Sequence, residues 1–317
     1  MPAYYSSRLN ESTHLVIHRD KYDEFPFIYV KVYRESSLVV VFDTGCGVQS
    51  AHHEQEAQDL KDFIQDELLK GEPANTDWLV VCTHCHFDHI GGIQSFADAN
   101  ASILASGHDD AFVNPVNRPA NSLCPAFGLP TPQFQISHFA GDGEVIEHNN
   151  RNLGLRAIHT PGHTPDSLAI YDEAERWLFV GDTFYQCVGQ MPWGEEQGVP
   201  IVFPLQGSWD DWQSTLTMLL DFVKTENAKH DKQLRVACGH TTSKSLASDL
   251  LQTVIRFGEG VANGSVPPIT EIPGDQVAPG GSLGNEVFVL WQDDSEPPFS
   301  MIAPKRFRDA FSKAAHT

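Results

Sequence analysis

The sequence lacks three features that would each assign it to a particular class of protein. No uninterrupted apolar run approaches the length needed to span a membrane. The first residues, Met1 to Ser7, contain neither the basic region nor the apolar region of a secretion signal. The six cysteines stand singly rather than in a spaced framework, which fits free thiols in a reducing compartment. We therefore expect a cytoplasmic location and no membrane partner.

Basic residues are also scarce. Lysine and arginine together number 21 against 42 acidic residues, which gives a formal net charge of -21. Such a surface repels the phosphate backbones that basic patches attract, so nucleic acid is not an expected partner. We expect a small-molecule substrate, and the composition carries no information on oligomeric state.

No polar linker rich in serine and glycine divides the 317 residues into independent units. The hydrophobic fraction of 41% is enough for a sizeable core. We therefore expect one domain over 1–317, with loop insertions near 114–135 and 186–208 and a C-terminal extension over 258–317.

Strands and helices alternate along the chain. Short β-branched and aromatic runs predict strands at 27–33, 38–42, 78–82, 103–105, 155–158, 167–171, 176–180, 234–238 and 286–291. Apolar residues at helical spacing predict helices over 54–69, 209–223, 246–257 and 306–313.

Five prolines between residues 114 and 132 predict a segment without regular helix or interior strand. Its interspersed apolar residues favour a packed lid over a disordered loop. The stretch from 186 to 206 is a second predicted irregular segment.

The run Thr83-His84-Cys85-His86-Phe87-Asp88-His89 follows a predicted buried strand. On an extended loop, alternate side chains point the same way, so His84 and His86 can reach one ion. Zinc takes imidazole and carboxylate ligands, and a paired site needs about six to seven of them. His163, Asp182 and His240 each follow a later predicted strand, so the chain offers that number. We interpret the other histidines, His159 among them, as structural.

Four motifs in this order resemble those of the metallo-β-lactamase superfamily: His84 to His89, Pro161-Gly162-His163-Thr164, Gly181-Asp182-Thr183 and Gly239-His240. The resemblance covers residues 27–245. It implies an α/β fold, the αββα sandwich of two mixed β-sheets flanked by helices, with metals in a groove at one edge. Carried over residue by residue, it implies that His84, His86 and His163 hold a first zinc, that Asp88, His89 and His240 hold a second, and that Asp182 bridges them. Two Zn²⁺ per chain are expected, with iron or manganese as alternatives.

The segment from Thr160 to Leu168 is similar to the glyoxalase II and thioesterase pattern, and Tyr185 stands where lactonases of the superfamily have a carbonyl-polarising tyrosine. The resemblance thus implies a hydrolase in which an activated hydroxide attacks the carbonyl of a lactone, thioester or lactam. We expect Asp88 to pass a proton to the leaving group and Tyr185 to polarise the carbonyl. The alternative for Tyr185 is a tyrosine that caps the core.

Tyr185, Trp193 and Phe203, together with the segment 114–135, are predicted to cover the metals and to favour an apolar or aromatic substrate. The alternative is that they pack the loops against the sandwich. A rival function keeps the same ligands: a persulfide dioxygenase with a single iron. Metal analysis distinguishes the two.

Overall fold

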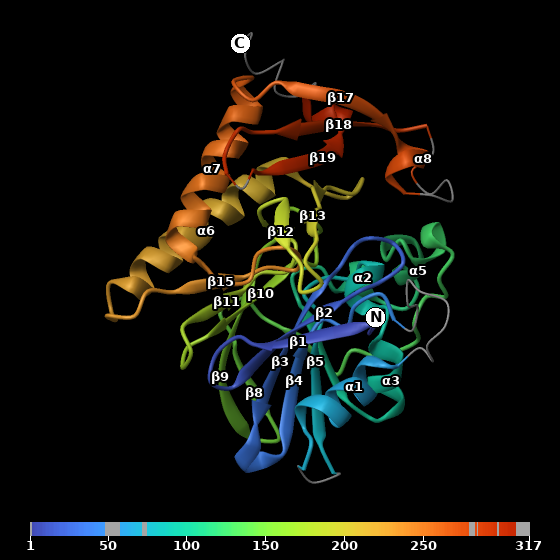
Figure 1. Ribbon diagram of the computed structural model, residues 1–317, viewed down its shortest axis with the longest axis vertical. Coiled ribbons are helices and arrows are strands. Elements are labelled where there is room, and N and C mark those ends of the chain that lie inside the picture. The colour runs from blue at the N-terminus through green and yellow to red at the C-terminus, as the bar shows by residue number, and fades with distance from the viewer. Residues whose placement is uncertain are drawn as a thin grey trace.

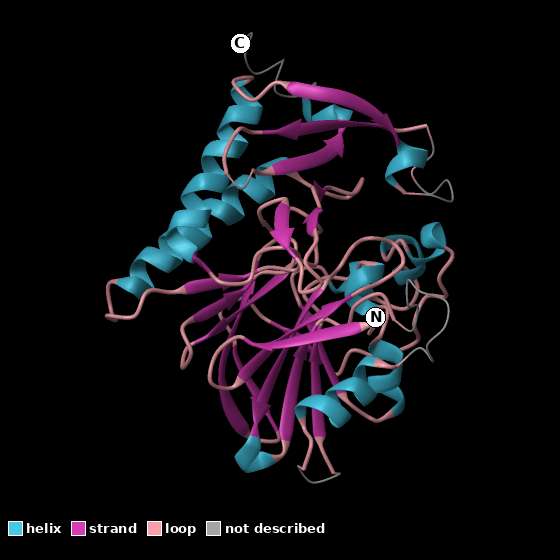
Figure 2. Cartoon of the chain, in the orientation of Figure 1, coloured by secondary structure: helices cyan, strands magenta, loops and turns pink. Residues whose placement is uncertain are grey.

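The computed structural model describes residues 2–47, 58–71, 75–278, 283, 285–296 and 298–308. In this part of the chain two mixed β-sheets face each other, and helices cover the outer face of each (Figure 1). The predicted αββα sandwich is therefore confirmed. Two smaller sheets lie beyond one end of it (Figure 2). Within the described residues, no helix combines the length and apolarity that crossing a membrane requires.

The first sheet contains seven strands that follow one another in chain order. The first four are antiparallel, and the last three continue parallel to β4. The predicted hairpin is confirmed as β3 and β4, whereas β1, β2 and β7 were not predicted. The strands are β1 (Tyr4–Arg8), β2 (Thr13–His18), β3 (Phe27–Tyr33), β4 (Leu38–Phe42), β5 (Asp77–Val81), β6 (Ser102–Ser106) and β7 (His138–Ala140).

The second sheet has six strands in the order β16-β15-β11-β10-β9-β8. Its neighbours are antiparallel except β11 and β15, which are parallel. As a result β9, β11 and β15 all run in one direction and end at the same edge. The strands are β8 (Val145–His148), β9 (Arg151–His159), β10 (Leu168–Asp172), β11 (Trp177–Phe179), β15 (Arg235–Ala237) and β16 (Ser245–Leu246).

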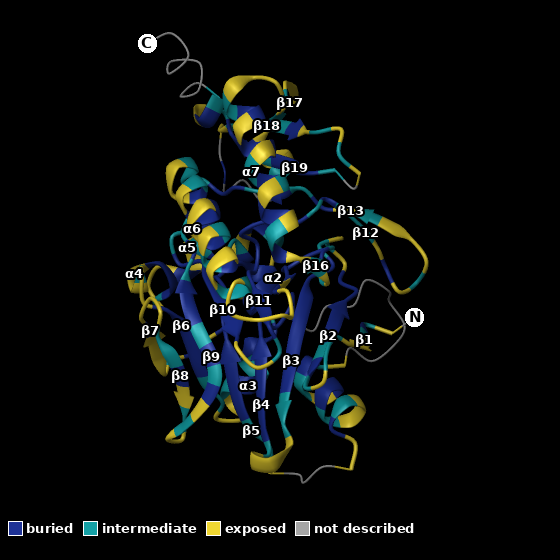
Figure 3. Ribbon diagram, turned by 90° about the vertical axis from the view of Figure 1, so that its left-hand side faces the viewer, coloured by how far each residue is buried: buried dark blue, intermediate teal, exposed yellow. Residues whose placement is uncertain are grey.

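The space between the sheets is filled by apolar side chains, so the strands are buried along most of their length (Figure 3). Phe42 of β4 stacks on Phe179 of β11 with ring centroids 4.5 Å apart. One buried ion pair crosses the interface, between Lys31 of β3 and Asp172 of β10 at 2.6 Å. Because a buried charge is costly without its partner, this pair favours a single alignment of the two sheets.

The long helices cover the second sheet, and shorter ones cover the first (Figure 1). The predicted helix over 54–69 is confirmed for 60–68, the last five residues as a π-helical turn, while 54–57 lie outside the described residues. The labelled helices are α1 (Leu60–Phe63), α2 (Phe87–Ile90), α3 (Ile93–Asp98), α4 (Asp110–Val113), α5 (Arg118–Asn121), α6 (Trp209–Asn227), α7 (Ala247–Asn263) and α8 (Gly274–Val277), with 3-10 turns at Arg34–Ser36 and Cys124–Phe127.

The proline-rich segment contains more helix than predicted. Helix α5 begins at Arg118 with Pro119 in its first turn, and the turn Cys124–Phe127 likewise has Pro125 near its start. The prediction that prolines exclude helix here was wrong, because a proline in the first helical turn has no hydrogen bond to lose.

The second insertion and the C-terminal extension also form strands that the sequence did not predict. Within 186–208 lie the hairpin β12 (Val188–Gln190) and β13 (Glu196–Gly198) and the short strand β14 (Ile201–Val202). Strand β14 joins a four-stranded sheet with β19 (Ser300–Pro304), β18 (Val287–Gln292) and β17 (Pro268–Pro273). The predicted strand 286–291 is β18. Residues 305–308 are helical, and the rest of the predicted helix 306–313 lies outside the described residues.

Candidate metal centre

Four loops at one edge of the sandwich carry the predicted ligands. The segment His84 to His89 follows β5 of the first sheet and ends in helix α2. His163, Asp182 and His240 follow β9, β11 and β15 of the second sheet. Because these strands end at the same edge, side chains far apart in sequence meet there in two groups: the trio His84, His86 and His163, and the quartet Asp88, His89, Asp182 and His240.

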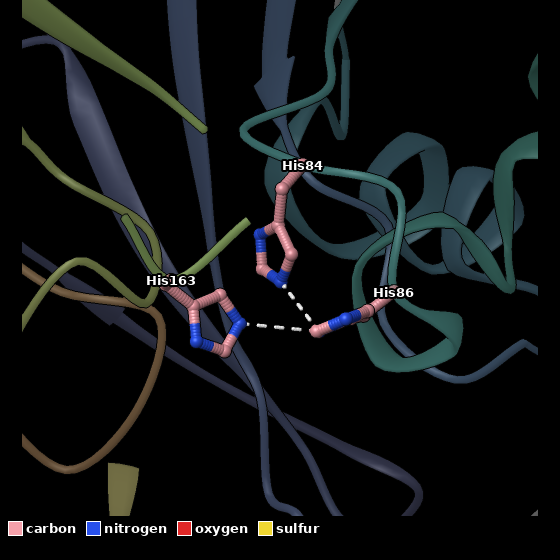
Figure 4. A group of neighbouring side chains, drawn as sticks. All are labelled: His84, His86 and His163. Atoms are coloured by element: carbon pink, nitrogen blue, oxygen red, sulfur yellow. Dashed lines mark hydrogen bonds between the residues drawn. The ribbon is translucent and has the colours of Figure 1, made fainter. Parts of the chain in front are cut away.

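The trio consists of three buried imidazoles that point toward one another (Figure 4). The Nδ1 atom of His86 lies 3.1 Å from Nε2 of His84 and 3.1 Å from Nε2 of His163. Nitrogen ligands on a tetrahedral zinc stand about 3.3 Å apart, since each lies about 2.0–2.1 Å from the ion. The spacing of the trio is therefore that of a ligand set.

Protonation of the trio is strongly disfavoured. Burial lowers the pKa of His86 to about 4 and that of His163 to about 3, and burial with the neighbouring histidines holds the pKa of His84 well below its usual range. The three rings are consequently neutral near pH 7. Neutral imidazole is the form that binds a metal, so the trio fits a cation.

The quartet combines two carboxylates with two imidazoles. Oδ2 of Asp88 lies 3.2 Å from Nε2 of both His89 and His240. Asp182 lies 3.3 Å from His89 through Oδ1 and 3.4 Å from His240 through Oδ2. Burial by itself would raise the pKa of both carboxyl groups, but His89 and His240 outweigh it and hold both pKa values well below the usual range.

Two atoms of the quartet support a metal ion at this place. Nε2 of His89 and Oδ1 of Asp182 are buried 3.3 Å apart, and neither makes a hydrogen bond of ordinary geometry in the described part of the chain. Buried polar atoms are normally paired, so atoms left without a partner need an explanation. A cation between them satisfies both.

Asp182 lies between the two groups, since its Oδ2 is also 3.9 Å from Nε2 of His163 in the trio. Its position depends on the absence of a side chain at Gly239, where a Cβ atom would come within 2.1 Å of Oδ1 of Asp182. The Gly239-His240 motif thus serves two purposes: the glycine makes room for the carboxylate, and the histidine contacts it.

Asp43, to which the sequence analysis assigned no role, orients the ligands from behind. One of its oxygens accepts a hydrogen bond from Nδ1 of His89 at 2.8 Å, and both receive hydrogen bonds from Thr83. This contact fixes the proton of His89 on Nδ1 and leaves Nε2 facing the quartet. The only signal in the sequence was the Asp-Thr-Gly run that closes the first hairpin.

The two groups face a cavity whose empty volume is about 600 Å³ when the open space at its mouth is included. Its described walls are mainly apolar, and no lysine or arginine lines them. The first insertion supplies Leu123 and Phe127, as the predicted lid requires. The lining residues that are not in the trio or quartet are Glu24, Phe87, Leu123, Phe127, Tyr185, Pro200, Val202, Phe203, Pro204, Val277, Ala278, Leu283 and Phe288.

The C-terminal extension also reaches this cavity, a contribution that the sequence analysis missed. Val277, Ala278, Leu283 and Phe288 line it, and all four belong to the apolar cluster around Ala126 of the first insertion. The extension has no chemical motif, so its part in the site follows from the way β18 and α8 lie over the strand ends.

Tyr185 and Phe203 both line the cavity. The hydroxyl of Tyr185, however, donates to the carbonyl oxygen of Pro200 at 3.0 Å, while the ring lies 5.2 Å from that of His240. Burial raises the pKa of this phenol well above its usual value, so the proton stays on the oxygen. With its proton already donated, the hydroxyl fits a core-capping tyrosine better than a donor to a substrate carbonyl.

Trp193 is not among the residues that line the cavity, which corrects its predicted place. It lies in the tight turn between β12 and β13, and its ring packs on Tyr5 and Phe25 at 5.2 and 5.3 Å. Its indole nitrogen donates to Glu195. The hairpin directs this tryptophan toward the N-terminal strands, so the interpretation as loop packing holds for Trp193.

Among the described residues that line the cavity, Glu24 is the one acidic or basic side chain outside the trio and quartet. Its backbone carbonyl accepts a hydrogen bond from Nδ1 of His240 at 2.7 Å. Burial and the neighbouring Asp88 raise the pKa of its carboxyl group to about 8. Nothing in the local sequence distinguishes Glu24 from an ordinary surface glutamate, so the sequence analysis missed it.

Comparison with known proteins agrees with this geometry. The model of the metallo-beta-lactamase superfamily matches residues 27–225. The Aspergillus versicolor protein avaE, whose name assigns it provisionally to the transcription factors, is 30% identical over 276 residues, which cover 84% of this chain and 78% of avaE. The human acyl-coenzyme A thioesterase MBLAC2 is 32% identical over 162 residues, or 48% of this chain and 56% of the thioesterase, so the match spans about half its length.

A solved structure supports the fold. The metallo-beta-lactamase from Pontibacter korlensis superposes with a TM-score of 0.54 over 81% of this chain and 99% of its own, at 14% identity. The matched residues include the loops that bear the trio. They also include three of the four strands that precede the ligands, namely β5, β9 and β11. The chain therefore belongs to the metallo-β-lactamase superfamily.

Proposed function

We propose that this hydrolase binds two zinc ions and cleaves the acyl bond of a thioester. The trio would hold one ion and Asp88, His89 and His240 the other, with Asp182 between them. The observation that carries the proposal is the meeting of the trio and the quartet, all buried, at the floor of an apolar cavity. Thioesters are preferred over lactones and lactams because MBLAC2 is named an acyl-coenzyme A thioesterase.

Bound zinc supplies a water that ionises near neutral pH and a positive charge for the substrate carbonyl. The chain's own residues do the remaining work. Asp88 lines the cavity and keeps its carboxylate ionised, so it can accept a proton and deliver it to the departing sulfur. Phe127 and Phe203 exclude bulk water and leave an apolar wall for the acyl group.

Two rival functions fit the chain less well. A nucleic-acid-binding role, as the name of avaE would imply, is disfavoured by a net charge of -21. A persulfide dioxygenase with one iron would leave the second site, Asp88, His89 and His240, without a metal. The likeness to an acyl-coenzyme A thioesterase favours the hydrolase.

The test is a substrate panel combined with metal analysis. Protein loaded with zinc is assayed with acyl thioesters, aryl esters, lactones and cyclic amides, and its metal content is measured by mass spectrometry. We expect two zinc ions per chain and the highest kcat/KM for a thioester. One iron per chain with oxygen uptake, or hydrolysis of none of these compounds, would overturn the proposal.

The variant His163→Ala removes one member of the trio and is expected to lower the metal content toward one ion per chain. His159→Ala is the matched control, because His159 lies four residues earlier and has its hydrogen bonds outside the trio. Its ring donates to the carbonyl oxygen of Ala140, and its backbone N–H donates to Oδ1 of Asp142. Equal metal content in the two variants would contradict the assignment of the trio.

A further inference from the structure

We infer that Glu24 is a specificity residue that hydrogen-bonds a hydroxyl group on an uncharged aromatic acyl substrate. The inference rests on the proposed function and deepens it by naming the acyl group. It follows from three observations: the way the loop holding Glu24 is built, the unpartnered carboxyl group at the cavity wall, and the shape and charge of the remaining walls.

The loop is built around the buried side chain of Asp20. Its carboxylate accepts hydrogen bonds from the backbone N–H groups of Tyr22, Glu24 and Phe25. Asp23 and Phe25 on either side of Glu24 adopt left-handed backbone angles, with φ of 63° and 49°. Such angles are unfavourable for residues with side chains and are retained where the surroundings enforce them, often at functional sites. Glu24 is therefore held in place.

The loop is also attached directly to the candidate metal centre. The carbonyl of Glu24 accepts from His240, and the N–H of Phe27 donates to the carbonyl of Gly239 at 2.6 Å. These contacts set the position of Glu24 relative to the quartet. A substrate carbonyl directed at the metals would place its acyl group within reach of this side chain.

The carboxyl group of Glu24 has no hydrogen bond or ion pair to any residue that the structure describes, although it lines the cavity. The groups that act on it electrostatically are Asp88, His240, Asp20 and Asp182. A half-buried carboxyl group without a partner is costly, and a ligand that supplies a donor offsets the cost. A hydroxyl group can do so whether the carboxyl is ionised or protonated, because a carboxyl oxygen accepts in both states.

The other residues that line the cavity determine which acyl group fits beside Glu24. Phe87 and Phe127 stack with centroids 4.0 Å apart, and Phe203 and Phe288 line the same cavity, which suits a flat ring. No basic side chain lines the described walls to pair with an anionic group. Bound metal ions would repel a cationic group. A neutral, hydroxylated aromatic ring meets all these conditions.

The experiment uses benzoyl thioesters of mercaptoethanol, a small neutral thiol, with the ring unsubstituted or bearing a 3-hydroxyl, 4-hydroxyl, 3-carboxyl or 3-aminomethyl group. For the wild-type chain we expect kcat/KM to be about tenfold higher for at least one hydroxybenzoyl thioester than for the benzoyl thioester, as one hydrogen bond allows. The carboxyl and aminomethyl compounds should be the poorest substrates.

Two variants test the role of Glu24. In Glu24→Leu the ratio of kcat/KM for hydroxybenzoyl to benzoyl thioester should fall to near one, whereas Glu24→Gln, which keeps an accepting oxygen, should retain most of it. Asp23→Asn is the matched control, because it removes an exposed charge from the same loop at a backbone angle that asparagine tolerates. Metal content and melting temperature are measured for each variant to verify folding.

A binding measurement separates the inference from the proposed function. Calorimetry with 3-hydroxybenzamide and benzamide, which are not thioesters, is performed on the zinc-loaded chain, where Glu24→Leu should abolish any preference for the hydroxylated ligand. Hydrolysis of benzoyl thioester with no hydroxyl preference, or a preference that survives in Glu24→Leu, overturns the inference alone. A preference for the aminomethyl compound identifies a cation site and also overturns it. Absence of hydrolysis for every thioester overturns the proposed function.

Discussion

Residues behind the ligands determine which ligand atoms face the candidate metal centre. His89 presents Nε2 to the quartet because Asp43 accepts the proton on Nδ1, and His240 does the same because Glu24 offers a backbone carbonyl. Carboxylate partners of this kind raise ligand basicity and hold the ring in place. The geometry of the candidate metal centre therefore depends also on Asp43 and Glu24, which orient the ligands without touching a metal themselves.

Removing the partner of His89 is expected to weaken the quartet. In Asp43→Ala the imidazole can rotate or change its tautomer, so the affinity for the second metal should fall about 10–100-fold. Competition with a coloured chelator measures this affinity. Asp142→Ala, which removes a carboxylate that contacts the N–H of His159 outside the site, is the control. An unchanged affinity in Asp43→Ala would show that the strand ends alone orient His89.

The role of Tyr185 can be decided by removing its hydroxyl. Because that hydroxyl donates to Pro200, Tyr185→Phe should lose about 1 kcal/mol of stability and keep kcat within about threefold. Thermal unfolding and steady-state kinetics with the best thioester measure the two effects. A loss of kcat above about 100-fold, with both metals retained, would instead support the carbonyl-polarising role expected from the sequence.

At the scale of elements, insertions and the C-terminal extension shape the cavity while the sandwich positions the ligands. The first insertion is held by one buried side chain, Arg118, which is 1% exposed. Its guanidinium donates to the carbonyl oxygens of Val113, Pro132 and Phe134 and lies 3.5 Å from the ring centroid of Phe134. Both ends of the segment that supplies Leu123 and Phe127 are thereby joined.

Loss of Arg118 should loosen this insertion. The variant Arg118→Ala leaves three carbonyl groups without their donor, and we expect it to lower the free energy of unfolding by about 2–4 kcal/mol. Limited proteolysis should then cut within 114–135 before the sandwich. Exposed Arg256, substituted by alanine, is the control for loss of an arginine. Equal proteolysis of the two variants would mean that the insertion is held by its apolar contacts alone.

Elements with a strong local pattern could be predicted from the sequence, and those that depend on distant partners could not. The short apolar runs of β5, β9 and β11 identified strands and so placed the ligands that follow them. Strand β17 begins and ends with proline and is mostly exposed, so it resembles a loop until its pairing with β18 is seen. Edge strands tolerate proline because one side of the strand makes no ladder bonds.

The same limit applied to the site. The ligands could be predicted because several histidines and aspartates follow strands in a dense pattern. Glu24 and Asp43 have no such pattern, and their roles arise from contacts with residues more than 40 positions away. The predicted place of Trp193 was wrong. Its position in a loop close to the ligands along the chain does not show in which direction the hairpin points its side chain.

For the whole molecule, all six cysteines are buried and free. Burial is the main cause that raises the pKa of each thiol, with Cys187 raised to about 11 and the others also above their usual value. Because a raised pKa means less thiolate at a given pH, increasing the pH from 7 to 8.5 should not start a reaction in the native state. We expect a thiol reagent such as DTNB to label six groups after denaturation and fewer than one before it. Rapid labelling of native protein would reveal an accessible thiolate.

The ligands come from both halves of the sandwich: His84 to His89 from the first sheet, and His163, Asp182 and His240 from the second. Neither sheet alone can assemble the trio or the quartet. Metal binding would therefore depend on folding, since a chain whose two sheets have not packed together cannot offer an ion the full set of donors. Bound ions would link the two sheets, so that loss of the metals would lower the stability of the fold as well as the activity.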